Sequence, residues 1–227
     1  MNLADFFYPE NPKMRETLIR RSQEIAELMK NNFRVTNQLI DVLQKYLGLH
    51  FSPITLNERA TVKANCDVFI QRIREIQSQL EKIDKELMKM LEPDLYEKLK
   101  RKDLSIPERA NVSGILREIQ FGVAFSAISL VVGSLFQMIP TLASIAGTCL
   151  VIATGLLAGV VFGVLLMGIN MIIQAILASY ERDRLKQALK EYEDALKDFR
   201  PASEKYQDSI IEVKLTIQLQ EKWNLFS

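Results

Sequence analysis

The chain has 227 residues and nearly balanced charge, with 29 Lys and Arg residues against 28 Asp and Glu residues. This balance argues against a nucleic-acid-binding protein, which needs a clustered basic excess. One His and two Cys are too few for a His-based metal site, a Cys-rich zinc module or a disulfide scaffold. We therefore expect no metal and no cofactor.

The first predicted helix runs from about Pro12 to Leu47 and carries a weak coiled-coil seam. Asn32 falls at a seam position, where a buried amide can fix the register of packing at some cost in stability. Gly48 suits the end of this helix, and Ser52-Pro53 suits a turn or a helix start. The seam positions are Leu18, Ile25, Leu28, Val35, Leu39, Val42 and Tyr46.

The clearest helical pattern extends from Val62 to Met90. Its apolar residues alternate spacings of four and three without a miss, which is the coiled-coil period. Pro93 is expected to break or restart the helix. Either the core of an ordinary bundle or the face of a partner-binding coil produces such a seam, and both interpretations stay open. The seam consists of Val62, Cys66, Phe69, Ile73, Ile76, Leu80, Ile83, Leu87 and Met90.

A stretch of 62 residues, 119–180, contains no Asp, Glu, Lys or Arg. A transmembrane helix needs about 20 mostly apolar residues. Two candidate spans, at about 121–139 and 142–169, are separated by Pro140. The alternative is a buried hairpin in a soluble bundle, but core helices usually keep charges on an outer face. The sequence therefore predicts an integral membrane segment whose partner is the lipid bilayer.

Basic residues flank the apolar segment on both sides, which is typical of cytoplasmic flanks. This pattern favours a hairpin with an uncharged turn at Gln137–Thr141 and both soluble arms in the cytosol. A single span through the longer run, Leu142 to Ile169, stays open. The basic flanks are Arg101, Lys102, Arg109 and Arg117 before the segment and Arg182, Arg184, Lys186, Lys190 and Lys197 after it.

Three glycines repeat every four residues in the second apolar run, at Gly155, Gly159 and Gly163. Residues four apart share a helix face, and small residues there let a second helix approach closely. We interpret them as a helix-packing face of the glycine-zipper type. The alternative is that glycine is simply frequent in membrane helices.

The last arm continues the four-three spacing from Leu185 to Ile217, through Pro201. Because the phase survives, we expect Pro201 to kink this helix without changing its buried face. The whole chain is therefore predicted to be all-α, with long amphipathic helices forming a coiled-coil-like bundle and an apolar membrane helix or hairpin. We divide it into 1–118, 119–180 and 181–227.

Catalytic chemistry is not apparent in the sequence. The glycines follow neither of the usual phosphate-binding loop patterns. A lone His50 and two Cys do not make a convincing nucleophile-base pair. We expect a non-enzymatic protein without a small-molecule substrate.

A series of short motifs occurs in order along nearly the whole chain. They are Tyr8-Pro9-Glu10-Asn11-Pro12-Lys13, Val35-Thr36-Asn37, Asn65-Cys66-Asp67, Leu91-Glu92-Pro93, Gly168-Ile169-Asn170 and Ala202-Ser203-Glu204-Lys205-Tyr206. In these motifs the chain resembles the single-pass membrane and coiled-coil domain-containing proteins. The resemblance implies a small membrane protein with a coiled coil, one span and no assigned catalytic activity, so it supplies no functional residues.

Two functional hypotheses follow from these features. The first is a membrane-anchored interaction or scaffold protein that presents helical arms to a helical protein partner or to a second copy of itself. The second is a helical protein that hides a glycine-rich apolar hairpin and then inserts it, in pore formation or membrane remodelling. Neither hypothesis involves nucleic acid.

Overall fold

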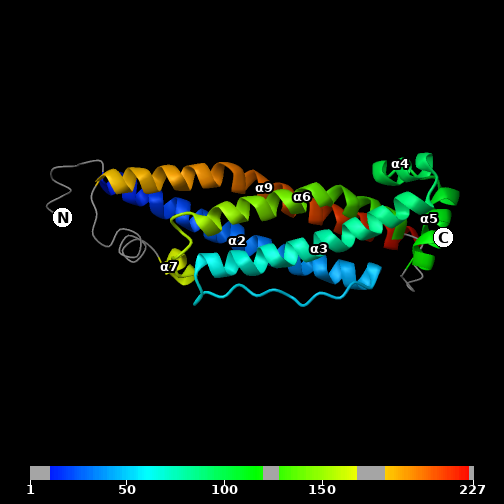
Figure 1. Cartoon of the computed structure of the whole chain (residues 1–227), viewed down its shortest axis with the longest axis horizontal. Helices are drawn as coiled ribbons and strands as arrows, with labels where there is room; N and C mark the ends of the chain where they lie inside the picture. The colour runs from blue at the N-terminus through cyan, green and yellow to red at the C-terminus, as the bar shows by residue number, and fades with distance from the viewer. Residues whose placement is uncertain (1–10, 120–127, 168–181, 225–227) are drawn as a thin grey trace. The chain divides into compact units, whose positions relative to one another are not determined.

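The computed structural model describes residues 11–119, 128–167 and 182–224. Within these residues the chain is all-α, with seven helices packed as a bundle, and one of the long helices is apolar (Figure 1). The fold class predicted from the sequence is confirmed. One isolated antiparallel bridge, Thr61 with Val161, joins two loop segments.

The helices follow the predicted arms closely. α3 has the same limits as the predicted seam, and α2 begins one residue before the predicted start. The helices are α2 (Asn11–Leu47), α3 (Val62–Met90), α4 (Pro93–Arg101), α5 (Ile106–Ile119), α6 (Ile128–Thr154), α7 (Phe162–Met167) and α9 (Arg182–Asn224).

Two compact units share the four longest helices. Unit 1 combines Met1–Phe33, Thr55–Gln71 and Ile145–Glu204, and unit 2 combines Arg34–Ile54, Arg72–Ser144 and Lys205–Ser227. Each unit therefore contains part of α2, α3, α6 and α9. The division of the sequence into 1–118, 119–180 and 181–227 stays a prediction. Each compact unit of the structure is built from separate stretches of chain.

Local sequence signals set the helix ends. Gly48 ends α2 with a φ of 62°, and its amide donates to the Gln44 carbonyl oxygen at 3.1 Å, as in the αL C-cap motif. Pro93 restarts the helix as the first residue of α4, as predicted. Ser105 and Glu108 form a capping box at the start of α5, where the Ser105 amide donates to Glu108 Oε2 at 2.8 Å.

Buried polar pairs connect α2 to α9 within each unit. In unit 1, Asn32 Nδ2 donates to Ser203 Oγ at 3.0 Å, and both residues are buried. In unit 2, the Thr36 and Tyr206 hydroxyls lie 2.8 Å apart, and burial raises the pKa of Tyr206. Because such pairs are satisfied in only one alignment of the two helices, they fix the register, as the sequence suggested for Asn32.

Candidate functional site: an apolar helix held in a bundle

Helix α6 has the length and composition of a membrane span. Within it, the 26 residues from Ser129 to Thr154 have no charged side chain, and an 18-residue window among them has a mean hydropathy of 1.8. At 1.5 Å per residue they extend about 39 Å, more than the roughly 30 Å of bilayer hydrocarbon. By this criterion α6 is the one candidate span among the described residues. Residues 121–127 and 168–169, which the predicted spans include, lie outside the described part of the chain.

The turn expected at Gln137–Thr141 is not formed, because α6 continues through Pro140. Proline removes one hydrogen bond of a helix and clashes with the preceding turn, but neighbouring packing can compensate. Here Pro140 lies on the exposed side of α6, and Thr141 and Leu142 beyond it are buried. Gln137, one turn earlier, donates to the Lys100 carbonyl oxygen at 2.7 Å. The helix is therefore anchored on both sides of the proline.

The chain turns after Thr154, where a short segment docks against the loop that precedes α3. The Val62 amide donates to the Val160 carbonyl oxygen and the Phe162 amide donates to the Ala60 carbonyl oxygen, both at 2.8 Å. Figure 1 shows this turn and α7 beside the start of α3. These bonds fix the end of α6 to α3 within unit 1.

The three glycines lie in this turn and in α7. Gly155 and Gly159 are in the turn, and Gly163 is in α7, so they share no helix face in this structure. A Cβ at Gly163 would lie 3.0 Å from the Glu58 carbonyl oxygen, so this glycine permits a close approach to a loop. The sequence pattern assumed one helix over 142–169, whereas α6 ends at Thr154. A helix-packing role for the stripe in a bilayer stays a prediction.

In unit 1, α6 packs against α3 through the two cysteines. The Cys66 and Cys149 side chains are neighbours, and both are buried without a disulfide. Asp67, the residue after Cys66, also lies near Cys149. Asp67 Oδ2 accepts from Lys63 Nζ at 2.6 Å, and both side chains are more than half exposed. A charged pair therefore lies beside the apolar helix.

In unit 2, α6 packs closely against α4. A Cβ at Gly133 would lie 2.7 Å from the Leu99 carbonyl oxygen, so a larger residue would force the two helices apart. Leu99 is fully buried in this contact region, as are Val131 and Val132 of α6. Sequence analysis gave Gly133 no role, because a single glycine in an apolar run has no distinguishing pattern.

The predicted coiled-coil seam faces the interior of the bundle. Eight of its nine residues are buried, and Met90 at the end of α3 is 47% exposed. The rings of Phe69 and Phe33 stack with centroids 5.6 Å apart, which joins α3 to α2 within unit 1. In this structure the seam is a bundle core and is not available to a partner.

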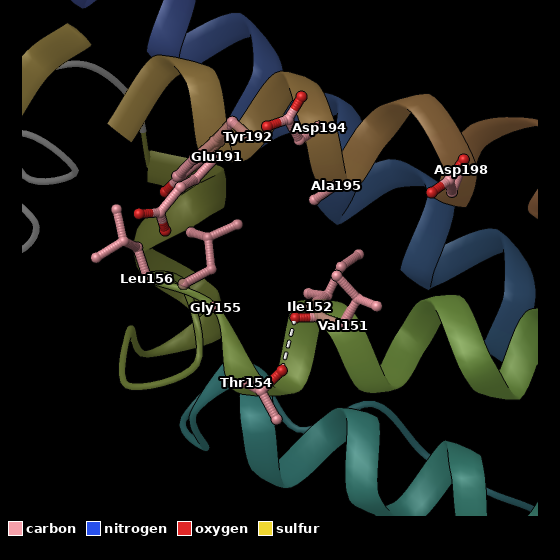
Figure 2. A pocket seen from close by; sticks show the side chains of 11 residues that line it. Val151, Ile152, Thr154, Gly155, Leu156, Glu191, Tyr192, Asp194, Ala195 and Asp198 are labelled. Carbon is pink, nitrogen blue, oxygen red and sulfur yellow. Dashed lines mark hydrogen bonds between the residues drawn. The ribbon is translucent and has the colours of Figure 1, made fainter. Parts of the chain in front are cut away.

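A groove of about 380 Å³ opens between the end of α6 and α9 in unit 1. Figure 2 shows Glu191, Asp194 and Asp198 on α9, with Val151 and Leu156 on the α6 side. Groups of three or more His, Cys, Asp or Glu able to hold a metal ion are not found among the described residues. The groove is therefore apolar on one side and acidic on the other.

Residues 14–174 match the model of the DUF4533 family, which is described as a protein of unknown function. The chain belongs to this family. No solved structure matches the chain. The family match covers α6 and most of the residues that surround it, so the apolar helix is a feature within the family region.

Proposed function

We propose that this non-enzymatic protein stores α6 in a helical bundle and exchanges the bundle for lipid, so that it becomes an integral membrane protein. The observation that carries the proposal is the position of α6. Helix α6 has no charged residue and is long enough to cross a bilayer. It nevertheless packs against helices with charged side chains, which are costly to move into lipid.

The packed arrangement and a membrane-spanning arrangement exclude each other. Cys149 lies within α6, and Lys63 and Asp67 lie next to its partner Cys66. If α6 crossed a bilayer with α3 still attached, this charged pair would enter the hydrocarbon region. Moving a charge into the hydrocarbon costs free energy, up to about 2.5–3.5 kcal/mol or more at the bilayer centre. Helix α6 must therefore leave α3 before it can span.

Partial burial of α6 is compatible with both settings. Half of its membrane-length window is buried in the bundle. In water this burial is favourable, because apolar surface is removed from solvent. In lipid the same surface needs no protein partner, since the acyl chains are equally apolar. Lipid thus replaces the packing that the bundle provides.

A disulfide lock tests the proposal on the full chain. Oxidation with diamide joins Cys66 to Cys149 and holds α6 on α3. We expect the oxidised protein to stay unbound when phosphatidylcholine–phosphatidylserine vesicles are floated on a gradient, and the reduced protein to float with them. The Cys149→Ser variant cannot be locked and should float in both conditions. Equal flotation of locked and reduced protein, or none for either, contradicts the proposal.

The released helix would give the protein its membrane location, with one charged arm on each side of the bilayer if α6 is the only span and both arms in the cytosol if the apolar segment forms a hairpin. One span through α6 agrees with the resemblance to single-pass proteins. A second span would need the apolar residues 168–180, which lie outside the described part of the chain. Protease protection of tags at both termini distinguishes these topologies, since one span places the termini on opposite sides.

A scaffold role is a second candidate, supported by exposed apolar residues on the arms. Met88 of α3 is 55% exposed in unit 2. A partner helix that uses it would lose affinity on Met88→Lys, while membrane flotation would be unchanged. If the unmodified protein and the Met88→Lys variant bound helical partners equally well, Met88 would not be part of the binding surface.

A further inference from the structure

The groove between the end of α6 and α9 in unit 1 sets two kinds of side chain against each other. Its apolar wall includes Val151 and Leu156, which are 57% and 46% exposed although both are large hydrophobic residues. Its other wall carries Glu191, Asp194 and Asp198 of α9 (Figure 2). Exposed apolar surface with a polar rim is typical of interaction sites. The groove therefore offers apolar and acidic surface side by side to a partner.

The chain itself does not neutralise the acidic wall. Asp194 and Asp198 make no hydrogen bond or ion pair within the described part of the chain, and Glu191 accepts one hydrogen bond, from the neutral Gln187 side chain at 3.2 Å. None of the described residues that line the groove is Lys or Arg. A partner that binds here is therefore favoured if it brings positive charge.

The carboxylates form a row along α9. They are three and four residues apart, so they lie on one side of the helix and extend over about 10 Å, or two turns. A single amine reaches only part of this row. A second helix with Lys or Arg at the same spacing reaches all three carboxylates, while its apolar residues contact Val151 and Leu156. An anionic lipid surface is disfavoured, because its phosphates would be repelled by the row.

We propose that this groove docks a basic amphipathic helix of a partner protein. Each exposed ion pair strengthens binding by only about 1.5-fold to 5-fold, so the association is weak and falls with added salt. Val151 and Ile152 belong to α6, so a bound helix also opposes the release of α6. This last consequence rests on the proposed function, whereas the docking itself does not.

Fluorescence anisotropy on the full chain, without vesicles, tests the docking site. The probe is a fluorescein-labelled amphipathic peptide of Leu and Lys, about 18 residues long so that it forms a helix. We expect the double variant Asp194→Asn with Asp198→Asn to bind it about tenfold more weakly. The matched control is Glu193→Gln with Glu204→Gln, which removes two exposed charges of α9 outside the groove and should leave affinity unchanged. Equal losses in the two double variants would overturn the proposal, because they indicate unspecific attraction to acidic surface.

A lysine placed in the apolar wall provides an independent check. Val151→Lys puts a cation opposite the carboxylates and should weaken peptide binding at least tenfold. Leu150→Lys, 44% exposed on the same helix but outside the groove, is the control and should change binding less than about twofold. Similar losses for the two lysines would contradict docking in the groove.

Other occupants of the groove give different results. If a peptide with Gln in place of every Lys binds as tightly, the site is merely apolar and the proposal is wrong. If the protein alone sediments as a dimer that the Asp194→Asn and Asp198→Asn pair disrupts, the occupant is a second copy, which also overturns the proposal. Because no vesicles are present, failure of these binding experiments leaves the outcome of the flotation experiment unaffected.

Discussion

Helices α6 and α9 both continue through an exposed proline, yet they suit different surroundings. α6 has 27 residues and no charged side chain, whereas α9 has 43 residues with charges throughout. The proline does not decide the structure in either case. What differs is the solvent that each helix accepts: α9 needs water on its outer side, while α6 can be surrounded by protein or by lipid.

The buried hydroxyl groups of the two helices show the same contrast. Ser203 and Tyr206 of α9 are hydrogen-bonded to α2 residues of their own units. The hydroxyls of Ser129 and Ser134 in α6 are buried without a hydrogen-bond partner in the described part of the chain. Tyr192 of α9 also has a buried hydroxyl without a partner in the described part of the chain, and Gln137 of α6 makes one hydrogen bond to Lys100. The contrast is therefore one of degree: two buried directional bonds join α9 to α2, while apolar packing supplies most of the contacts of α6. Apolar packing is the kind of contact that lipid can replace.

The largest expected effect comes from a substitution that creates a cavity beside α9. Phe199 is fully buried in unit 1, and Phe199→Ala should lower the free energy of unfolding by about 3–5 kcal/mol. Because the bundle then holds α6 less tightly, vesicle binding should increase. Chemical denaturation and flotation measure the two quantities. Weaker bundle stability together with reduced vesicle binding would contradict the exchange of bundle for lipid.

A charge on the exposed face of α6 should disfavour insertion into a bilayer while leaving the bundle stable. Ser144 is exposed near the middle of the apolar window, so Ser144→Lys should leave the bundle nearly as stable as before. In a bilayer the same charge costs about 2.5–3.5 kcal/mol, and vesicle insertion should fall about a hundredfold. The matched change Gln187→Lys, on the exposed face of α9, should leave insertion unaltered. If Ser144→Lys and Gln187→Lys changed vesicle insertion equally, α6 would be no more likely than α9 to enter the bilayer.

Replacing the prolines tests whether both helices are continuous. Pro140→Ala and Pro201→Ala should each stabilise the protein by about 1–3 kcal/mol, because alanine restores a helical hydrogen bond at an exposed site. Thermal unfolding measures this gain. A gain at Pro201 but none at Pro140 would indicate that the chain turns at Pro140, as the sequence first suggested.

The smallest expected effect concerns the buried hydroxyls. Tyr206→Phe should cost about 1 kcal/mol, since the hydrogen bond between the Tyr206 and Thr36 hydroxyls is lost. Ser134→Ala removes a hydroxyl that has no partner in the described part of the chain, so its cost should be near zero. Denaturant unfolding of the two variants compares them directly. A larger cost at Ser134 would mean that specific bonds hold α6 as well.

Sequence reasoning predicted the charged helices better than the apolar one. The four-three spacing located α3, and Pro93 marked its end, because alternating apolar and charged residues report which face is buried. In α6 every face is apolar, so periodicity carries no such information. The turn was therefore placed at Pro140 instead of after Thr154, and the glycines were assigned to a helix. The contacts at Gly133 and Cys149 depend on packing between distant segments, which local sequence does not encode.

Thiol accessibility on the full chain tests the release of α6 most directly. Cys66 lies on charged α3 and Cys149 on apolar α6, and both are buried against each other. With single-cysteine variants, a membrane-impermeant maleimide should label neither thiol in solution. After vesicles are added, we predict that Cys66 becomes labelled while Cys149 enters the lipid and stays protected. Continued protection of both thiols on vesicles would show that α6 remains in the bundle, which contradicts the account.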